Sequence, residues 1–243
     1  SRRQRQMCIR DRSSSFGLYT WMNNPESQMV AVTVRAGSKA EMALPDGTFV
    51  HLNAATNLEY DVNNSKQRLV KLSGEAFFDV AKNPDCPFKV IINDLQIEVV
   101  GTSFNVKTYK KDIVETSLLS GRIRISGGSL PHEYTLSPGQ KATYSAMDRT
   151  LRISKADAHV EAGWRDNYLI FESTPLIDVI AQIERWYGVE IRLHHKQIAQ
   201  DLLSGSFRNE SIQNVIRSLS IQYGFKYEIH KDCLLYTSDA ADD

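Results

Sequence analysis

The chain has 243 residues, 42% hydrophobic and 24% charged, which is enough apolar material for one or two soluble globular domains. Its formal net charge is zero, which excludes the excess of Lys and Arg that neutralises phosphates in nucleic-acid-binding proteins. Only Cys86 lies outside the terminal segments, and no apolar run approaches the roughly 20 residues that cross a bilayer, so neither a disulfide framework nor a membrane helix is predicted.

The two ends of the chain lack the patterns found elsewhere in the sequence. Residues 1–12 are rich in arginine and residues 233–243 in aspartate, and neither segment has useful periodicity or turn signals. Both are similar to translated sequencing-adapter read-through, so we interpret them as non-native ends; a basic arm and an acidic tail are the alternative. Residues 13–40 are mixed and polar, and are predicted to form a juxtamembrane or linker segment, with a hydrophobic strand or hinge as the alternative.

Residues 41–154 are predicted to form an all-β domain. Turn signals such as Pro45–Gly47 recur at intervals of roughly 8–12 residues, which indicates about nine short strands. The clearest alternation of apolar and polar residues runs from residue 69 to residue 106. Its predicted buried positions are Ala76, Phe78, Val80, Phe88, Val90, Ile92, Leu95, Ile97 and Val99. Strands of this kind bury one face and leave the other in water.

Residues 155–163 are predicted to be a linker, and residues 164–231 a second domain with an internal repeat. The segment 171–193 aligns with the segment 207–229 without a gap, at an offset of 36 residues. In each copy, apolar residues recur at the helical spacing i, i+3, i+4, i+7, and short strand patterns flank the helix. A single copy could not bury its helix, so the two are predicted to pack together as one compact unit.

The caps of the two predicted helices support the repeat. Thr174 followed by Pro175 is the predicted start of the first helix, and Ser211 is the predicted N-cap of the second. Gly188 and Gly224 occupy the positions at which a left-handed residue ends a helix. The predicted fold class is therefore mainly β plus α+β: an N-terminal all-β domain, solenoid-like or a sandwich, followed by a small β-α-β-β-α-β domain.

The sequence contains few candidates for catalysis or metal binding. It has no GxSxG, Walker, HExxH or CxxC motif. His194 and His195 are adjacent on a predicted strand, so their side chains point to opposite faces and make a poor metal site. No pattern brings Asp46 and Glu75 together, and we interpret them as a turn residue and an exposed strand residue. We predict no metal, no cofactor and no enzymatic activity toward a substrate.

Gly101 and Thr102, in the sequence VVGTSFNV, offer one specific reaction. A Thr hydroxyl can attack the preceding carbonyl when the peptide is strained, and water can then cut the resulting ester. The glycine leaves that carbonyl uncrowded and permits unusual torsion angles. The pair is therefore a candidate self-cleavage site, and a structural bulge or corner glycine is the alternative.

Taken together, several of these stretches resemble the FecR family of transmembrane anti-sigma regulators, in the form common in Bacteroidetes. In residues 41–145 they are LPDGTFVHLNAATNLEY, VKLSGEAFFDVAKNPDCPFKV, VVGTSFNVKTY, ETSLLSGRIRI and LSPGQKATY. The second domain, from NYLIFESTPLIDVIAQIERWYGVEI to GFKYEI, resembles the C-terminal domain of that group. It is also similar to the short N-terminal domain of secretins and TonB-dependent receptors.

The resemblance implies the periplasmic part of a single-pass inner-membrane protein. In the family, a cytoplasmic segment binds an extracytoplasmic-function sigma factor and one membrane helix follows; we expect both to be absent from this chain. The periplasmic part reads the signalling domain of an outer-membrane TonB-dependent transducer for iron or polysaccharide uptake. Some members cut themselves at a Gly-Thr pair that matches Gly101 and Thr102.

The expected contact with the transducer is strand addition to an exposed edge of the second domain. The candidate edge strands are residues 189–193 and 203–207. The predicted interface residues are Val189, Ile191, Leu193, Leu203 and Phe207.

Two other classes of protein stay open at this point. A cell-envelope carbohydrate- or protein-binding β-module would expose a row of Trp or Tyr on one sheet face, but Trp164 and Trp186 lie outside the predicted β-region. A hydrolase would need a pocket with a nucleophile and a base, and the sequence indicates none.

Overall fold

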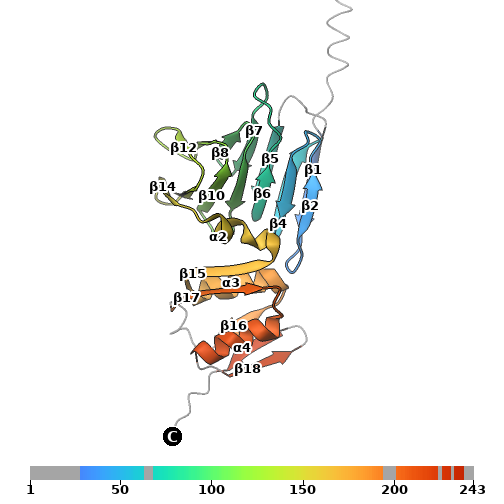
Figure 1. Ribbon diagram of the computed structural model, residues 1–243, viewed down its shortest axis with the longest axis vertical. Coiled ribbons are helices and arrows are strands. Elements are labelled where there is room, and N and C mark those ends of the chain that lie inside the picture. Colours follow the sequence, from blue (N-terminus) through green and yellow to red (C-terminus); the bar gives the residue numbers. More distant parts are fainter. Residues whose placement is uncertain (1–27, 63–67, 194–200, 224–225, 231–232, 238–243) are drawn as a thin grey trace, which may run out of the picture.

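The computed structural model describes residues 28–62, 68–193, 201–223, 226–230 and 233–237. They form a β-sandwich followed by a smaller α+β domain, which lies below the sandwich in Figure 1. A short helical segment and the first strand of the α+β domain lie between the two parts (Figure 1). The predicted fold class, mainly β plus α+β, is confirmed, with a sandwich as its first domain.

The sandwich consists of two seven-stranded sheets. In order, the strands of the first sheet are β1 (Met29–Val34), β4 (Thr56–Asp61), β5 (Arg68–Ser73), β7 (Phe88–Ile92), β8 (Leu95–Val99), β11 (Ile123–Gly127) and β12 (Tyr134–Leu136). Those of the second sheet are β14 (Thr150–Lys155), β13 (Gln140–Ser145), β10 (Ile113–Ser120), β9 (Ser103–Lys107), β6 (Glu75–Asp79), β3 (Phe49–Leu52) and β2 (Ala40–Ala43). Neighbouring strands are antiparallel except β5 and β7, which are parallel because the chain crosses to the second sheet between them.

The core of the sandwich lies between the two sheets. All nine positions that the alternation predicts to be buried have at most 6% of their surface exposed. The rings of Phe78 and Phe104, from neighbouring strands of the second sheet, stack with centroids 5.2 Å apart, and Phe88 of the first sheet packs against Phe78 at 5.8 Å. The period of two in the sequence therefore identifies the face of each sheet that points inward.

Two predicted linkers contain regular structure. Residues 29–34, inside the segment predicted to be juxtamembrane or linker, form β1 and pair with β4 at the edge of the first sheet. The predicted linker 155–163 contains α2 (Ala158–Ala162) and leads into the 3₁₀-helix η1 (Gly163–Asp166). The carboxylate of Asp157 caps α2 by accepting from the backbone N–H of His159 at 2.8 Å. Both segments are ordered by tertiary partners, which a local hydrophobic pattern does not reveal.

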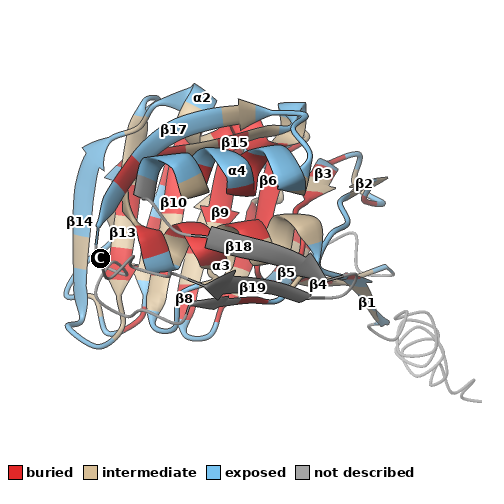
Figure 2. Cartoon of the chain, turned by 90° about the horizontal axis from the view of Figure 1, so that it is seen from below, coloured by how far each residue is buried: buried red, intermediate tan, exposed pale blue. Residues whose placement is uncertain are grey.

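The α+β domain contains the predicted repeat. Its elements are β15 (Tyr168–Pro175), α3 (Leu176–Tyr187), β16 (Ile191–Leu193), β17 (Leu202–Arg208), α4 (Ile212–Tyr223), β18 (Lys226–His230) and β19 (Cys233–Thr237). The two helices are each 12 residues long and start at equivalent positions of the repeat. Strands β15 and β17 form an antiparallel pair, and β16, β19 and β18 form a three-stranded sheet in that order. Figure 2, seen from below, shows α3 and α4 with β15 and β17.

The predicted helix caps are found with one small shift. Pro175, not Thr174, is the N-cap of α3, and Gly188 ends the helix in the left-handed conformation with φ 68°. The hydroxyl of Ser211 accepts from the backbone N–H of Asn214 at 3.3 Å, as expected of an N-cap. Gly224 lies outside the described residues. Residues 233–237, from the end predicted to be non-native, form β19; the origin of this end stays a prediction.

Candidate functional site

Gly101 and Thr102 lie at the corner where the chain passes from β8 in the first sheet to β9 in the second. Thr102 is 3% exposed. Its hydroxyl donates to the carbonyl oxygen of Arg122 at 3.1 Å, and its own carbonyl accepts from the N–H of Val80 at 3.0 Å. The candidate nucleophile is therefore buried and held in a defined position.

The glycines around this corner are required by close packing. A Cβ at Gly101 would lie 2.7 Å from the Cβ of Lys82, a distance that real Cβ atoms essentially never show. Gly121 has φ +90°, and a Cβ there would lie 2.7 Å from both the Gly101 carbonyl oxygen and the Thr102 hydroxyl. Gly101 itself is not among the residues with positive φ. Crowding explains both glycines, whereas self-cleavage stays a prediction.

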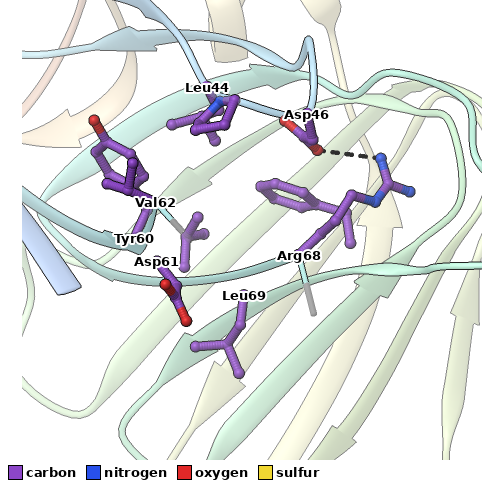
Figure 3. A pocket seen from close by; sticks show the side chains of 10 residues that line it. Leu44, Asp46, Tyr60, Asp61, Val62, Arg68 and Leu69 are labelled. Carbon is purple, nitrogen blue, oxygen red and sulfur yellow. Dashed lines mark hydrogen bonds and ion pairs between the residues drawn. The ribbon is translucent and has the colours of Figure 1, made fainter. Parts of the chain in front are cut away.

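Arg68 at the start of β5 holds the loops next to this corner. Its side chain is 3% exposed and forms an ion pair with Asp46 at 3.2 Å, which Figure 3 shows as a dashed line. Its other acceptors are the carbonyl oxygens of Cys86 at 2.6 Å, Ala81 at 2.7 Å, Asn83 at 3.2 Å and Val100 at 3.5 Å. One buried guanidinium thus joins the turn at Asp46, the loop after β6 and the residue before Gly101.

The cavity beside Arg68 is too small for most ligands. Figure 3 shows side chains that line it, including Leu44, Tyr60, Val62 and Leu69. Its volume is about 70 Å³, whereas pockets for small molecules usually hold about 300–1,000 Å³. We therefore assign Arg68 and Asp46 a structural role.

The residues predicted to form the partner interface are mostly part of the core of the α+β domain. Ile191 is 7% exposed and Leu203 is 2% exposed. Val189 and Phe207 are partly buried against the same core, and the side chain of Leu193 lies outside the described residues. The alternation in the sequence selects the inward face of a strand, so the side chains of Ile191 and Leu203 do not form an exposed surface.

A strand can also bind a partner through its backbone edge. Strand β17 pairs with β15 on one side, and no strand of the described chain pairs with it on the other. Leu202, at its start, is 63% exposed, and Ile177 at the start of α3 is 46% exposed. An unpaired strand beside exposed apolar residues is the type of surface to which another strand can be added.

Glu75 corrects the sequence-based expectation of an exposed strand residue. It is 6% exposed, and its carboxylate accepts from the side-chain amides of Asn53 at 2.7 Å and Asn105 at 2.9 Å. The indole N–H of Trp164 in η1 donates to Asn105 at 3.1 Å. The outer face of β6 is buried because η1 and α3 cover it, and Phe77 on this face packs against Trp164. Glu75 and Asp46 do not share a site.

Helix α3 contacts the sandwich through charged and aromatic side chains. The guanidinium of Arg185 lies 4.2 Å from the ring centroid of Tyr109, in the loop between β9 and β10. In the same loop, Lys110 forms an ion pair with Asp178 at 2.7 Å. The ammonium group of Lys39 lies 3.7 Å from the ring centroid of Trp186. These contacts fix the α+β domain against one end of the sandwich.

The pKa shifts at this junction indicate that water is partly excluded from it. Burial lowers the pKa of Lys39 to about 8, although the negative charges of Glu75 and Asp166 oppose the shift. Lys39 is exposed by its total surface area, but its ammonium group is enclosed by Trp164, Asn167 and Trp186. Burial also raises the pKa of Tyr109 and lowers that of Arg185.

A cleft of about 510 Å³ separates the two domains beside these contacts. Its charged lining is largely paired: Lys141 contacts Glu115 at 3.2 Å and Glu161 at 2.9 Å. Because these charged groups are already paired with one another, few of them are available to bind a ligand. We therefore interpret the cleft as a gap between docked domains.

The described part of the chain contains no candidate metal site, and its two tryptophans are both packed against other groups. No group of three or more His, Cys, Asp or Glu could hold a metal ion among these residues. His194 and His195 lie outside the described residues. Trp164 is 6% exposed, and Trp186 is in contact with Lys39, so neither presents a free face of the kind that binds sugars.

Comparisons with known proteins decide the family. Residues 30–124 match the model of the FecR protein domain, and residues 168–236 match the model of the FecR C-terminal domain. The chain belongs to the FecR family. The family match and the solved structures described next support a regulatory role, the control of a sigma factor.

Solved structures agree with this assignment. Two crystal structures of a candidate anti-sigma factor from Parabacteroides distasonis ATCC 8503, at 1.65 and 2.50 Å resolution, each match the FecR chain with a TM-score of 0.78. Their sequence identities are 29% and 28%, over 87% and 88% of this chain and 100% of each of those chains. No curated protein matches the sequence significantly. In the residues described, no helix has the length and hydropathy needed to cross a membrane.

Sequence reasoning missed three features of this FecR chain. Lys39 and Arg185 carry no local signal, because their partners are more than 70 residues away in the chain. Arg68 has no sequence signal that distinguishes it from an exposed polar residue on an alternating strand, so its burial was not predicted. Glu75 had a signal: Phe77 on the same supposedly wet face indicates that something covers that face.

Proposed function

We propose that this FecR chain is the periplasmic sensor of a transmembrane anti-sigma regulator. It receives its signal from the signalling domain of an outer-membrane TonB-dependent transducer and controls an extracytoplasmic-function sigma factor. The inner membrane and the sigma factor are engaged through other segments of the regulator. The observation that carries the proposal is that one edge of β17 pairs with no described strand, in the domain that matches the FecR C-terminal model.

The proposed contact is the addition of a transducer strand to β17. Unpaired N–H and C=O groups supply affinity, and neighbouring side chains supply specificity. The exposed residues of β17 include Leu202, Ser204, Ser206 and Arg208. These residues replace Leu203 and Phe207 as side chains available to a partner, because the latter face the core.

Leu202→Asp is expected to weaken transducer binding by at least about tenfold, because it places a charge where an apolar contact is desolvated. Isothermal titration calorimetry with the transducer's signalling domain measures the effect. Ile221→Asp is a matched control, since Ile221 is 75% exposed on α4 of the same domain. Equal affinity of the parent and Leu202→Asp would exclude the β17 edge as the binding site.

Thr102→Ala is expected to abolish self-cleavage, because it removes the only hydroxyl that can attack the Gly101 carbonyl from the next residue. The measurement is the intact mass of the protein after expression in a periplasm. The parent should give two fragments that meet between Gly101 and Thr102, and the variant one species. A single intact species from both proteins would make this corner purely structural.

A further inference from the structure

The turn between β1 and β2, residues 35–39, makes a backbone contact with the C-terminal end of α3. The N–H of Gly37 donates to the carbonyl oxygen of Arg185 at 2.8 Å. A Cβ on Gly37 would lie 3.3 Å from the Cα of Gly188, and a Cβ on Gly188 would lie 3.3 Å from the Cα of Gly37. The two glycines thus allow the main chains of the two domains to touch.

This contact satisfies a group that a helix leaves unpaired. Arg185 belongs to the last turn of α3, where carbonyl oxygens have no N–H donor within the helix. Gly188 bonds instead to the carbonyl of Glu184 at 2.8 Å. An N–H from the sandwich therefore completes the C-terminal cap of a helix in the other domain.

Lys39 adds side-chain contacts to the same turn. Its ammonium group donates to the carbonyl oxygen of Trp164 at 2.6 Å and to the Asn167 side chain at 2.9 Å. It also lies over the ring of Trp186 in α3, at 3.7 Å from the centroid. The turn therefore binds both α3 and the segment that connects the two domains.

The turn joins β1 to β2, and each of these is the edge strand of its sheet, with a single neighbouring strand among the described residues. β1 is the edge strand of the first sheet and pairs only with β4. Its alternate residues Met29, Ala31 and Thr33 are exposed. By contrast, Asp178 and Arg185 of α3 contact Lys110 and Tyr109, which belong to the loop between β9 and β10. These two strands lie inside the second sheet. A displacement of α3 is therefore resisted less by β1 than by β9 and β10.

We infer that residues 35–39 are a mechanical latch that transmits a displacement of α3 to β1 and to the chain before it. The inference rests on the proposed function, because it describes how a strand bound at β17 would be sensed at the opposite end of the molecule. Helix α3 packs against β15 and β17, so strand addition at β17 acts directly on the latched helix.

Hydrogen–deuterium exchange on the whole chain tests the latch without any partner. Trp186→Ala removes the ring beneath Lys39, and we expect amide exchange in β1 and residues 35–39 to rise by about tenfold or more. Exchange in β7 and β8 should not change. Asp178→Ala is the matched control, because it removes the α3 contact to Lys110 but leaves the latch in place. Unchanged exchange in β1 of Trp186→Ala, with faster exchange in α3, would overturn the inference.

A second variant keeps the test decisive if Trp186→Ala also loosens α4. Gly188→Ala acts on the backbone contact from the α3 side, because Gly188 has φ +68° and a Cβ there would lie 3.1 Å from the carbonyl oxygen of Ala36. Amide exchange in β1 should rise by about tenfold or more relative to the parent. Unchanged exchange in β1 would overturn the latch. Neither experiment involves the transducer, so a failure of the β17 assignment is detected separately by Leu202→Asp.

Discussion

Arg68→Met is expected to lower the free energy of unfolding of the sandwich by about 3–5 kcal/mol, the range for removing one partner of a buried ion pair. Methionine retains much of the side-chain volume, so the loss comes from polar groups and not from a large cavity. Asp46 loses its counterion, and the carbonyl groups of Ala81 and Cys86 lose their donor. Unpaired groups of this kind cost roughly 1–3 kcal/mol each when water cannot replace the donor.

Denaturant unfolding followed by circular dichroism measures this loss. Arg124→Met is the matched control: Arg124 has a side chain 56% exposed and pairs with Glu98 and Glu133 at the surface. Its expected effect is within about 0.5 kcal/mol, as for most exposed ion pairs. Amide exchange should also increase around Asn83 and Val100 in Arg68→Met. A loss below about 1 kcal/mol would show that water takes over the role of the guanidinium.

Glu75→Leu is expected to destabilise the protein by about 2–5 kcal/mol, because two buried amide donors lose their acceptor at once. These donors belong to Asn53 and Asn105, and Asn105 in turn accepts from Trp164. We therefore expect the change to loosen η1 as well as the sandwich. The tryptophan fluorescence of the folded variant should shift to longer wavelength as Trp164 becomes more accessible to water.

Two further variants separate the hydrogen bonds from the general effect of placing leucine on a strand. Glu75→Gln keeps one carbonyl acceptor and should cost about 1–2 kcal/mol, less than Glu75→Leu. Glu59→Leu changes a glutamate with a side chain 38% exposed that pairs with Lys71 at 3.8 Å, and should cost less than about 0.5 kcal/mol. If Glu75→Leu proved as stable as Glu59→Leu, the buried network would not contribute to stability.

Local patterns were sufficient for most of the fold. Alternation identified the inward face of β6, β7 and β8, because every second residue of a strand points the same way regardless of its partners. The 36-residue repeat identified α3 and α4, since helical spacing and caps depend only on nearby residues. Strand alternation and helical spacing are properties of short segments, so they can be recognised from the sequence without knowledge of the tertiary structure.

The same patterns failed where a surface is covered by a distant segment. Glu75 and Phe77 occupy the outward face of β6, and only the packing of η1 and α3 on that face makes them buried. Ile191 and Leu203 lie on the strands predicted to be edge strands, and their side chains are buried in the core. Contact with a partner through a strand edge stays a prediction.

The remaining features depend on contacts between segments far apart in the chain. In the sequence, Gly37 has the features of an ordinary turn residue, and only the structure shows its contact with α3. Lys39 likewise has the features of a surface lysine, and only the structure shows that Trp164 and Trp186 enclose its ammonium group. Residue order specifies which face of each element is apolar, because this depends on local geometry. The packing of the two domains decides which of these faces come into contact. It also decides which strand edges, such as that of β17, pair with no other described strand.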